Sequence, residues 1–220
     1  QVHDYIGFHP KPNFRVEGAC ATGSMALRTG WMNVASGLAD LTLVVGVEKM
    51  TEVTTSMATG IMGRGGDAIW EYPFGTTFPG YYAMIANAHM AEFGTTEEQL
   101  AMVAVKNHHY GSLNPYAHMQ KKIDLEKALT SFTVAHPLKL YDCSLITDGA
   151  AAILLASEEK AKAISKKPVW IAGLALATDT MRMGDRETLT SILATREAAK
   201  TAYKMAGVGP SDIDVATVHD

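Results

Sequence analysis

A largely apolar stretch at residues 41–47 most constrains how this chain can fold. It reads Leu-Thr-Leu-Val-Val-Gly-Val, is rich in β-branched residues and has the length of a strand. Because both of its faces are apolar, the pattern predicts a strand buried in the middle of a sheet. A helical pattern over residues 24–36 precedes it and stops at Gly37. A helix followed so soon by a strand predicts an α/β layer architecture.

Further elements follow the same logic. The apolar run at 150–156 predicts a second buried strand, and a short charged helix is expected to begin at Ser157. The patterns farther along the chain predict a strand beginning at 169–175, an amphipathic helix over 189–205 and a final strand at 215–218.

The stretch between the two apolar strands has a different character. From Glu48 to about Pro137 it is rich in methionine, glycine and aromatic residues. Helical patterns are visible at 82–93 and 96–110, and Thr95-Thr96-Glu97-Glu98 supplies a helix cap. We interpret this region as a long excursion from the sheet, and such excursions often carry substrate sites.

Composition excludes several classes of protein. A length of 220 residues with 47% hydrophobic residues suffices for a sizeable core. Two cysteines in unlike settings argue against a disulfide scaffold and for a reducing compartment. A net charge of −4 without a basic cluster argues against nucleic acid as a partner. The apolar runs are too short to span a membrane, and no signal peptide is visible, so a cytoplasmic protein is expected.

Cys20 is the candidate nucleophile. Small residues surround it, and the helical pattern that begins a few residues later places it at the first turn of a helix. Backbone N–H groups and the positive end of the helix dipole favour a thiolate there, which is the nucleophilic form. A lone cysteine is more often a small core residue, and that alternative stays open. Cys143 lies in a polar turn with no helix opening on it, which indicates a structural thiol.

Several motifs, in this order, resemble the thiolase family. They are Glu-Gly-Ala-Cys-Ala-Thr-Gly-Ser at 17–24, Val-Gly-Val-Glu-Lys-Met at 45–50 and Asp-Gly-Ala-Ala-Ala at 148–152. Three more are similar to the branch that holds archaeal acetyl-CoA acetyltransferases and sterol-carrier-protein thiolases: Lys-Asn-His at 106–108, Asn-Pro-Tyr-Ala at 114–117 and Asp-Cys-Ser at 142–144. The similarity extends over essentially the whole chain.

The resemblance implies a fold and a domain organisation. Thiolases have a five-layered α-β-α-β-α fold built from two similar α/β halves, with a loop domain inserted in the first half. Residues 1–165 would be a partial N-terminal half, including a loop domain at about 50–137 that covers the pantetheine arm of CoA. Residues 166–220 would begin the C-terminal half. The expected fold is therefore α/β and thiolase-like, but incomplete at both ends.

The resemblance also implies a chemistry. The family's acyl-accepting nucleophile maps onto Cys20, which would make the protein an acetyl-CoA C-acetyltransferase acting by Claisen condensation or thiolysis. His219-Asp220 resembles the start of the branch's His-Asp-Cys-Phe motif, in which the histidine holds a water molecule of an oxyanion hole. CoA thioesters would be substrates, and no permanently bound cofactor is implied.

One part of the family pattern does not occur in these residues. The Cys-Gly-His-Pro segment, which supplies the acid/base cysteine and an activating histidine, is not found in residues 1–220. The chain alone is therefore expected to be inactive in Claisen condensation, because the proton alpha to the thioester has no suitably placed acceptor.

Partners follow from the resemblance. Thiolases form dimers, often paired into tetramers, and archaeal members are similar to subunits that associate with a 3-hydroxy-3-methylglutaryl-CoA synthase. The anionic nucleotide of CoA would call for basic residues, and four are available without anything to select among them: Lys121, Lys122, Arg182 and Arg186. No metal site is predicted, since the adjacent His108 and His109 would point about 100° apart on a helix.

Three other readings remain open. A ketoacyl-synthase-like condensing enzyme would share the fold and a cysteine in the N-terminal half. A cysteine peptidase would also begin a helix at its nucleophile. A non-catalytic thiolase-like subunit that binds acyl-CoA, or that scaffolds a multienzyme complex, would need no base at all.

Overall fold

The computed structural model describes residues 2–219, so that Asp220 of the His-Asp pair lies outside the described residues. The chain forms two compact units. We call residues 1–47 with 150–174 the sheet unit, and residues 48–149 with 175–220 the helical unit. Among the described residues, no helix combines the length and the apolar character needed to cross a membrane.

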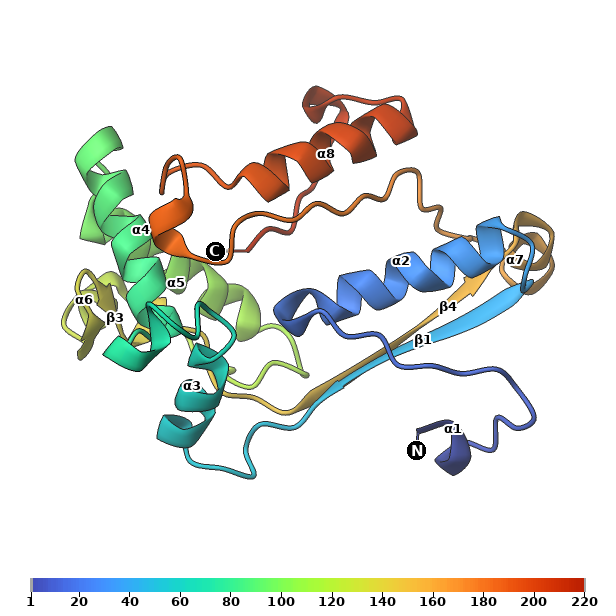
Figure 1. Cartoon of the computed structure of the whole chain (residues 1–220), viewed down its shortest axis with the longest axis horizontal. Coiled ribbons are helices and arrows are strands. Elements are labelled where there is room, and N and C mark those ends of the chain that lie inside the picture. Colours follow the sequence, from blue (N-terminus) through green and yellow to red (C-terminus); the bar gives the residue numbers. More distant parts are fainter. Residues whose placement is uncertain (1, 220) are drawn as a thin grey trace. The chain divides into compact units, whose positions relative to one another are not determined.

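The sheet unit is a helix packed on a two-stranded sheet. Strand β1 (Leu41–Glu48) pairs with β4 (Gly149–Ala156), and the two run in opposite directions (Figure 1). Helix α2 (Thr22–Ala35) lies along this sheet (Figure 1). Gly30 marks the contact, because a Cβ added to it would lie 2.7 Å from Val44 Cγ2 and 3.0 Å from Leu155 Cδ1. The predicted helix–strand succession is confirmed.

The burial predicted for β1 is wrong. The side chains on one face are exposed, from 36% for Leu43 to 65% for Val47. The cause is that α2 covers only the face that carries Thr42 and Val44, and within the described residues the sheet has only two strands. A run that is apolar on both faces thus has one face covered and one open. The sheet unit thus consists of α2 packed on one face of a two-stranded sheet.

The two later strands are also corrected. Residues 169–175 and 215–218 are extended but form no strand in the described part of the chain. A β-strand is defined by hydrogen bonds to a neighbour, and none of the described strands pairs with either segment. The short elements α1 (Val2–Tyr5) and α7 (Glu158–Ile164) complete the sheet unit, with Ser157 capping α7 as its pattern indicated.

The helical unit is built mainly from helices with small buried residues. Its elements are α3 (Thr55–Gly63), α4 (Phe78–Phe93), α5 (Glu97–Gly111), α6 (Leu125–Leu129), the strands β2 (Thr133–Ala135) and β3 (Leu138–Lys139), and α8 (Leu193–Ala206). Four alanines and one tyrosine form much of its core: Ala58, Tyr81, Ala83, Ala101 and Ala104. Small side chains let neighbouring helices approach closely.

Capping residues account for where these helices begin and end. Helix α4 starts four residues earlier than predicted, because the Thr77 side chain accepts a hydrogen bond from Gly80 and a proline stands in its first turn. Thr96 caps α5, as the sequence indicated, and it also forms a capping box with Gln99 that the sequence analysis did not predict. Gly94 and Gly207 end α4 and α8 in the left-handed conformation, with φ of 70° and 71°.

Helix α4 is tied to the β2–β3 hairpin. The side-chain amide of Asn87 donates hydrogen bonds to the carbonyl oxygens of Ala83 and His136, both at 2.9 Å. The first of these lies in α4 itself and the second in the turn between the two strands. Nearby, the ammonium group of Lys139 forms a hydrogen-bonded ion pair with Glu97 of α5. The hydrogen bond from Lys139 is the main cause of the lowered pKa of the Glu97 carboxyl.

Candidate active site

Cys20 lies in the turn that leads into α2. The turn is a single 3-10 turn, Ala19–Ala21, and Cys20 is an exposed free thiol. No side chain caps α2, whose N-cap residue is Ala21, so the first turn keeps backbone N–H groups without a capping side chain. Ala19 has φ +49°, a left-handed conformation that is uncommon for a residue with a Cβ. Cys20 thus lies one residue before the N-cap of α2, close to the predicted place but not in the first turn of the helix.

Glu17 holds this turn in place. Its Oε1 accepts hydrogen bonds from Gly18 N, Ala19 N and Thr22 Oγ1 at 3.2, 3.0 and 3.0 Å. Its Oε2 accepts a 2.7 Å bond from Arg15. Arg15 above all, then Thr22 and Ala19, lower the pKa of Glu17 to about 2. One carboxylate thus ties the residues on both sides of Cys20 together.

Sequence reasoning did not single Glu17 out as a functional residue. Its signal is a carboxylate three residues before the cysteine with a threonine two residues after it. In the sequence this pair is indistinguishable from ordinary polar residues. Only the folded turn brings Glu17 and Thr22 together. Thr22 is shared between two bonds, since its Oγ1 also accepts from Gly18 N at 2.9 Å.

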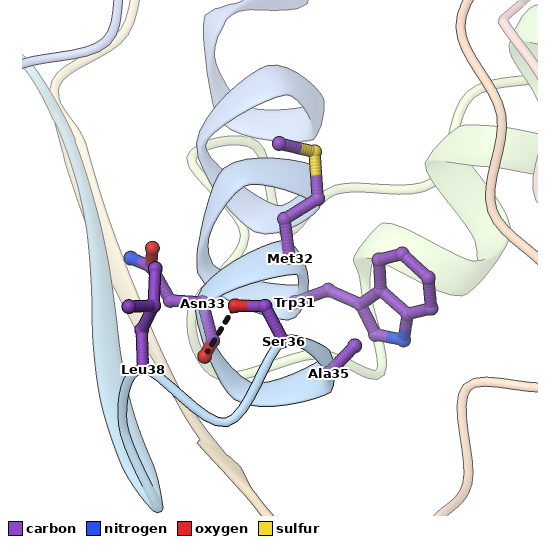
Figure 2. Close-up of a pocket in the computed structure, with 6 residues that line it drawn as sticks. All are labelled: Trp31, Met32, Asn33, Ala35, Ser36 and Leu38. Carbon is purple, nitrogen blue, oxygen red and sulfur yellow. Dashed lines mark hydrogen bonds between the residues drawn. The ribbon is translucent and has the colours of Figure 1, made fainter.

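A shallow hollow lies at the opposite end of α2 from Cys20. It is lined by Trp31, Met32, Asn33, Ala35, Ser36 and Leu38 (Figure 2). An α-helix rises 1.5 Å per residue, so the length of α2 separates this hollow from Cys20 by roughly 20 Å. It is therefore not part of the nucleophile's surroundings.

The second cysteine has a different setting. Cys143 follows the short turn Leu140–Asp142 in the helical unit and is half-buried. Burial, and secondly the charge of Asp142, raise the pKa of its thiol. A thiol held neutral is a poor nucleophile, which agrees with the structural role that the sequence indicated for Cys143.

His219 lies at the end of an extended, exposed segment of the helical unit. Its imidazole stacks on the ring of Tyr82 in α4, with centroids 5.4 Å apart and an angle of 13° between the ring planes. Cys20 belongs to the sheet unit and His219 to the helical unit. The surroundings of each residue are therefore given within its own unit. Tyr82 did not stand out in the sequence, because it reads as one of many aromatic residues in the excursion.

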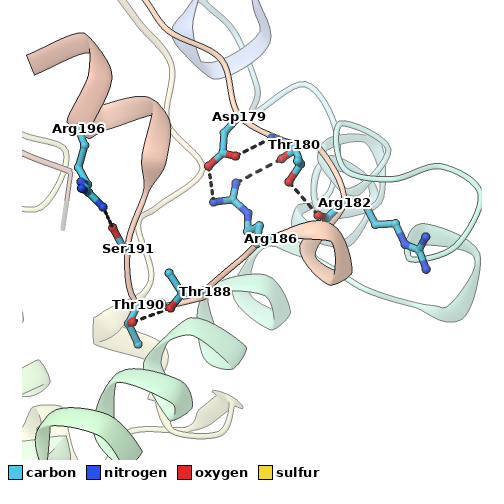
Figure 3. A network of polar contacts seen from close by, with 8 residues as sticks. All are labelled: Asp179, Thr180, Arg182, Arg186, Thr188, Thr190, Ser191 and Arg196. Carbon is cyan, nitrogen blue, oxygen red and sulfur yellow. Dashed lines mark hydrogen bonds and ion pairs between the residues drawn. The ribbon is translucent and has the colours of Figure 1, made fainter. Parts of the chain in front are cut away.

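The basic residues considered for CoA differ in how much they are already engaged. Arg186 forms a 3.1 Å ion pair with Asp179 and a further bond to the carbonyl oxygen of Thr180 (Figure 3). Arg182 lies over the ring of Trp70 at 5.7 Å. Lys121 and Lys122 are exposed. Arg182 is also paired, with Asp185 at 3.6 Å, so both arginines already contact carboxylates.

One trio of potential metal ligands was not anticipated. His3, Asp4 and His9 have donor atoms within 4.8 Å of one another, the only such group in residues 2–219. Asp4 lies 3.2 Å from His3 Nε2 and 3.6 Å from His9 Nδ1, and Asp4 and His9 are largely exposed. His108 and His109 are adjacent in the sequence. The Nδ1 atom of His108 lies 2.9 Å from the carbonyl oxygen of Lys121.

Comparison with known proteins identifies the family. Residues 1–159 match the family model "Thiolase, N-terminal domain", and residues 175–220 match "Thiolase C-terminal domain-like". Acetyl-CoA acetyltransferases from Methanothermobacter thermautotrophicus and Methanocaldococcus jannaschii are 47% and 46% identical over 219 and 221 residues. Both alignments cover the whole of this chain but only 57% and 56% of the relatives.

A solved structure agrees with these matches. The Ltp2-ChsH2(DUF35) aldolase is 28% identical, with a TM-score of 0.71 over 89% of this chain and 50% of that chain. The resemblance first indicated by the motifs around Cys20 is thereby confirmed. The chain belongs to the thiolase family.

Proposed function

We propose that these residues form part of an acetyl-CoA C-acetyltransferase that makes or cleaves acetoacetyl-CoA through an acetyl group on Cys20. The observation that carries the proposal is the exposed thiol of Cys20 in a turn held by Glu17 at the start of α2. The 46–47% identity to archaeal acetyl-CoA acetyltransferases supports the same activity. Because those relatives are nearly twice as long, we propose that the chain acts within a longer polypeptide. The proposed division of the chain is residues 1–165 and 166–220, with the loop domain at about 50–137.

The chemistry begins at sulfur. The Cys20 thiolate attacks the carbonyl carbon of acetyl-CoA, and the tetrahedral intermediate expels the CoA thiolate, leaving an acetyl thioester on Cys20. The start of α2 is a favourable place for the charge on the intermediate's oxygen, since helix N-termini stabilise anions. In the second step of the reaction, the carbanion of another acetyl-CoA attacks the acetyl group on Cys20, and Cys20 leaves as a thiolate.

The carbanion step needs two further groups. A water molecule held by His219 would polarise the thioester carbonyl whose methyl group loses the proton. The proton itself must pass to a base, which the family places in a Cys-Gly-His-Pro segment outside these 220 residues. CoA thioesters are thus the substrates, and no permanently bound cofactor takes part.

The biological setting is proposed on the same grounds. We expect a homodimer or a tetramer, and an association with a 3-hydroxy-3-methylglutaryl-CoA synthase that would consume acetoacetyl-CoA in the mevalonate pathway. The two unpaired cysteines fit a cytoplasmic location.

Mass spectrometry tests the acetyl-enzyme directly. The protein as its gene encodes it is incubated with acetyl-CoA and digested, and we expect one acetyl group on the Cys20 peptide. Cys20→Ser should remove this label and lower turnover by at least about a thousandfold. Cys143→Ser is the matched control and should behave as the wild type. An unlabelled Cys20 peptide, or a Cys20→Ser variant with normal turnover, would contradict the proposal.

The alternative is a thiolase-like subunit that binds acyl-CoA without condensing it, or that scaffolds a complex. The observation in its favour is that residues 1–220 contain no Cys-Gly-His-Pro segment to supply the base. This alternative predicts acyl-CoA binding by calorimetry with no acetyl-Cys20 and no acetoacetyl-CoA formed. If the protein is an acetyltransferase, we expect both acetyl-Cys20 and acetoacetyl-CoA to form.

A further inference from the structure

We infer that Tyr82 is a positioning residue that sets the plane of the His219 imidazole. The inference deepens the proposed function, because it rests on the oxyanion-hole role proposed for His219. Tyr82 is not a catalytic residue in this scheme, since it acts only through His219.

The contact is unlike the other ring pairs of the molecule. Tyr82 and His219 stack at 13°, whereas every other ring pair in the described residues has an interplanar angle between 49° and 79°. With the centroids 5.4 Å apart, the two near-parallel rings are offset, so the imidazole overlaps only part of the tyrosine ring. The two ring nitrogens then lie in a plane that Tyr82 defines, and they point along it rather than toward Tyr82.

Tyr82 is well supported for this role. The adjacent Tyr81 is only 6% exposed, packs edge to face on Phe78 and fits so closely over Gly66 that a Cβ there would lie 2.3 Å from its hydroxyl oxygen. Asn87 ties the same helix to the β2–β3 hairpin. The backbone of Tyr82 is therefore fixed, while its side chain, 40% exposed, remains available to His219.

His219, in contrast, has little other support. Within residues 2–219, neither of its ring nitrogens forms a hydrogen bond or an ion pair, and residues 213–219 belong to no helix or strand. The stack with Tyr82 therefore restricts rotation of the imidazole. It leaves the nitrogens available to hold a water molecule, which is what an oxyanion hole requires.

Nuclear magnetic resonance tests the contact without relying on activity. In the protein as its gene encodes it, labelled with ¹³C and ¹⁵N at histidine, the Tyr82 ring current should shift the His219 ring protons upfield. Tyr82→Ala should abolish this shift and Tyr82→Phe should keep it, because phenylalanine retains the ring. Tyr110→Ala is the matched control, since it removes the ring that contacts His109 and should leave the His219 signals unchanged.

Kinetics test whether the contact matters. For acetoacetyl-CoA synthesis, Tyr82→Ala should lower kcat about three- to tenfold, with KM changed less than about twofold, and Tyr82→Phe should restore kcat. A loss of packing alone would instead lower thermal stability and affect all steps, so melting curves accompany each variant. Tyr82→Leu, which fills the same space without an aromatic face, replaces Tyr82→Ala if the latter does not fold.

The outcomes are distinct. The inference is supported if Tyr82→Ala loses the His219 shift and has a lowered kcat, and if Tyr82→Phe recovers both. An unchanged His219 spectrum in Tyr82→Ala overturns it, and so does a lost shift with kcat within twofold of the wild type. If the wild type forms no acetyl-Cys20, the proposed function fails, and the spectra still show whether Tyr82 orients His219.

Discussion

The carboxylate of Asp148 accepts hydrogen bonds from both the hydroxyl and the amide of Thr51, which lies 97 residues earlier in the chain. The two bonds measure 2.6 and 2.9 Å, and a third, from Met50 N, measures 2.7 Å. The bonds from Thr51 are the largest cause of the lowered pKa of Asp148. Because Asp148 directly precedes β4 and Met50 soon follows β1, these bonds close the long excursion where it leaves and rejoins the sheet strands.

Removing this carboxylate should loosen the base of the excursion. In Asp148→Ala, we expect the amide protons of Met50 and Thr51 to exchange with solvent roughly tenfold faster, because charge-assisted acceptors are lost. Hydrogen exchange followed by mass spectrometry measures this. Asp214→Ala serves as the control, because it removes a carboxylate that accepts no amide hydrogen bond from residues 2–219. Equal exchange in both variants would mean that Asp148 does not close the excursion.

Acid should release the turn that carries Cys20. The pKa of Glu17 is lowered from 4.5 to about 2 in the folded protein. The unfolded chain therefore binds the proton more readily, so the stabilisation is complete above about pH 4.5 and disappears as the pH falls through about 2. Unfolding by denaturant across this range should show the dependence. In Glu17→Gln this part of the pH dependence of stability should be absent. If the stability of Glu17→Gln depends on pH as that of the wild type does, the prediction is wrong.

Two glycines of α2 should respond to alanine in opposite ways. Gly30→Ala places a Cβ 2.7 Å from Val44 Cγ2, and we expect destabilisation by about 1–3 kcal/mol from overpacking. Gly23 has nothing within 4 Å of an added Cβ, so Gly23→Ala should be neutral or stabilising by up to about 1 kcal/mol. Thermal unfolding of the two variants decides the point. Stabilisation by Gly30→Ala would show that α2 does not pack on the sheet as described.

The two cysteines should differ in reactivity. Cys20 is exposed, whereas Cys143 is half-buried and burial raises the pKa of its thiol. At pH 8, iodoacetamide should label Cys20 about tenfold faster than Cys143. Peptide mapping at timed intervals gives both rates in one sample, and denatured protein provides the reference in which the difference disappears. Faster labelling of Cys143 in the native protein would contradict the assignment.

Residues 1–220 alone should not catalyse Claisen condensation. No Cys-Gly-His-Pro base is present in them, so the carbanion has no proton acceptor of suitable placement. An acetoacetyl-CoA assay on the purified 220-residue chain, beside the protein as its gene encodes it, tests this. A measurable rate from the 220 residues alone would overturn the prediction.

Local signals in the sequence predicted much of the structure correctly. Capping residues and glycine stops located α4, α5 and α8 to within a few residues, since caps act through nearest neighbours in the chain. The motif around Cys20 predicted both its place before α2 and the family. The strands expected at 169–175 and 215–218 were wrong, because pairing depends on a neighbour that a local pattern does not reveal.

The sequence by itself determined the approximate positions of α2, α4, α5, α7 and α8, the place of Cys20 next to the start of α2 and the membership of the thiolase family. These depend on short-range hydrogen bonds and an ordered set of motifs. Only the tertiary structure decided that Glu17 holds the Cys20 turn, that Asp148 closes the excursion onto Thr51, and that His219 stacks on Tyr82. Each of these contacts depends on a carboxylate or a ring meeting a particular partner in three dimensions, sometimes across more than a hundred residues.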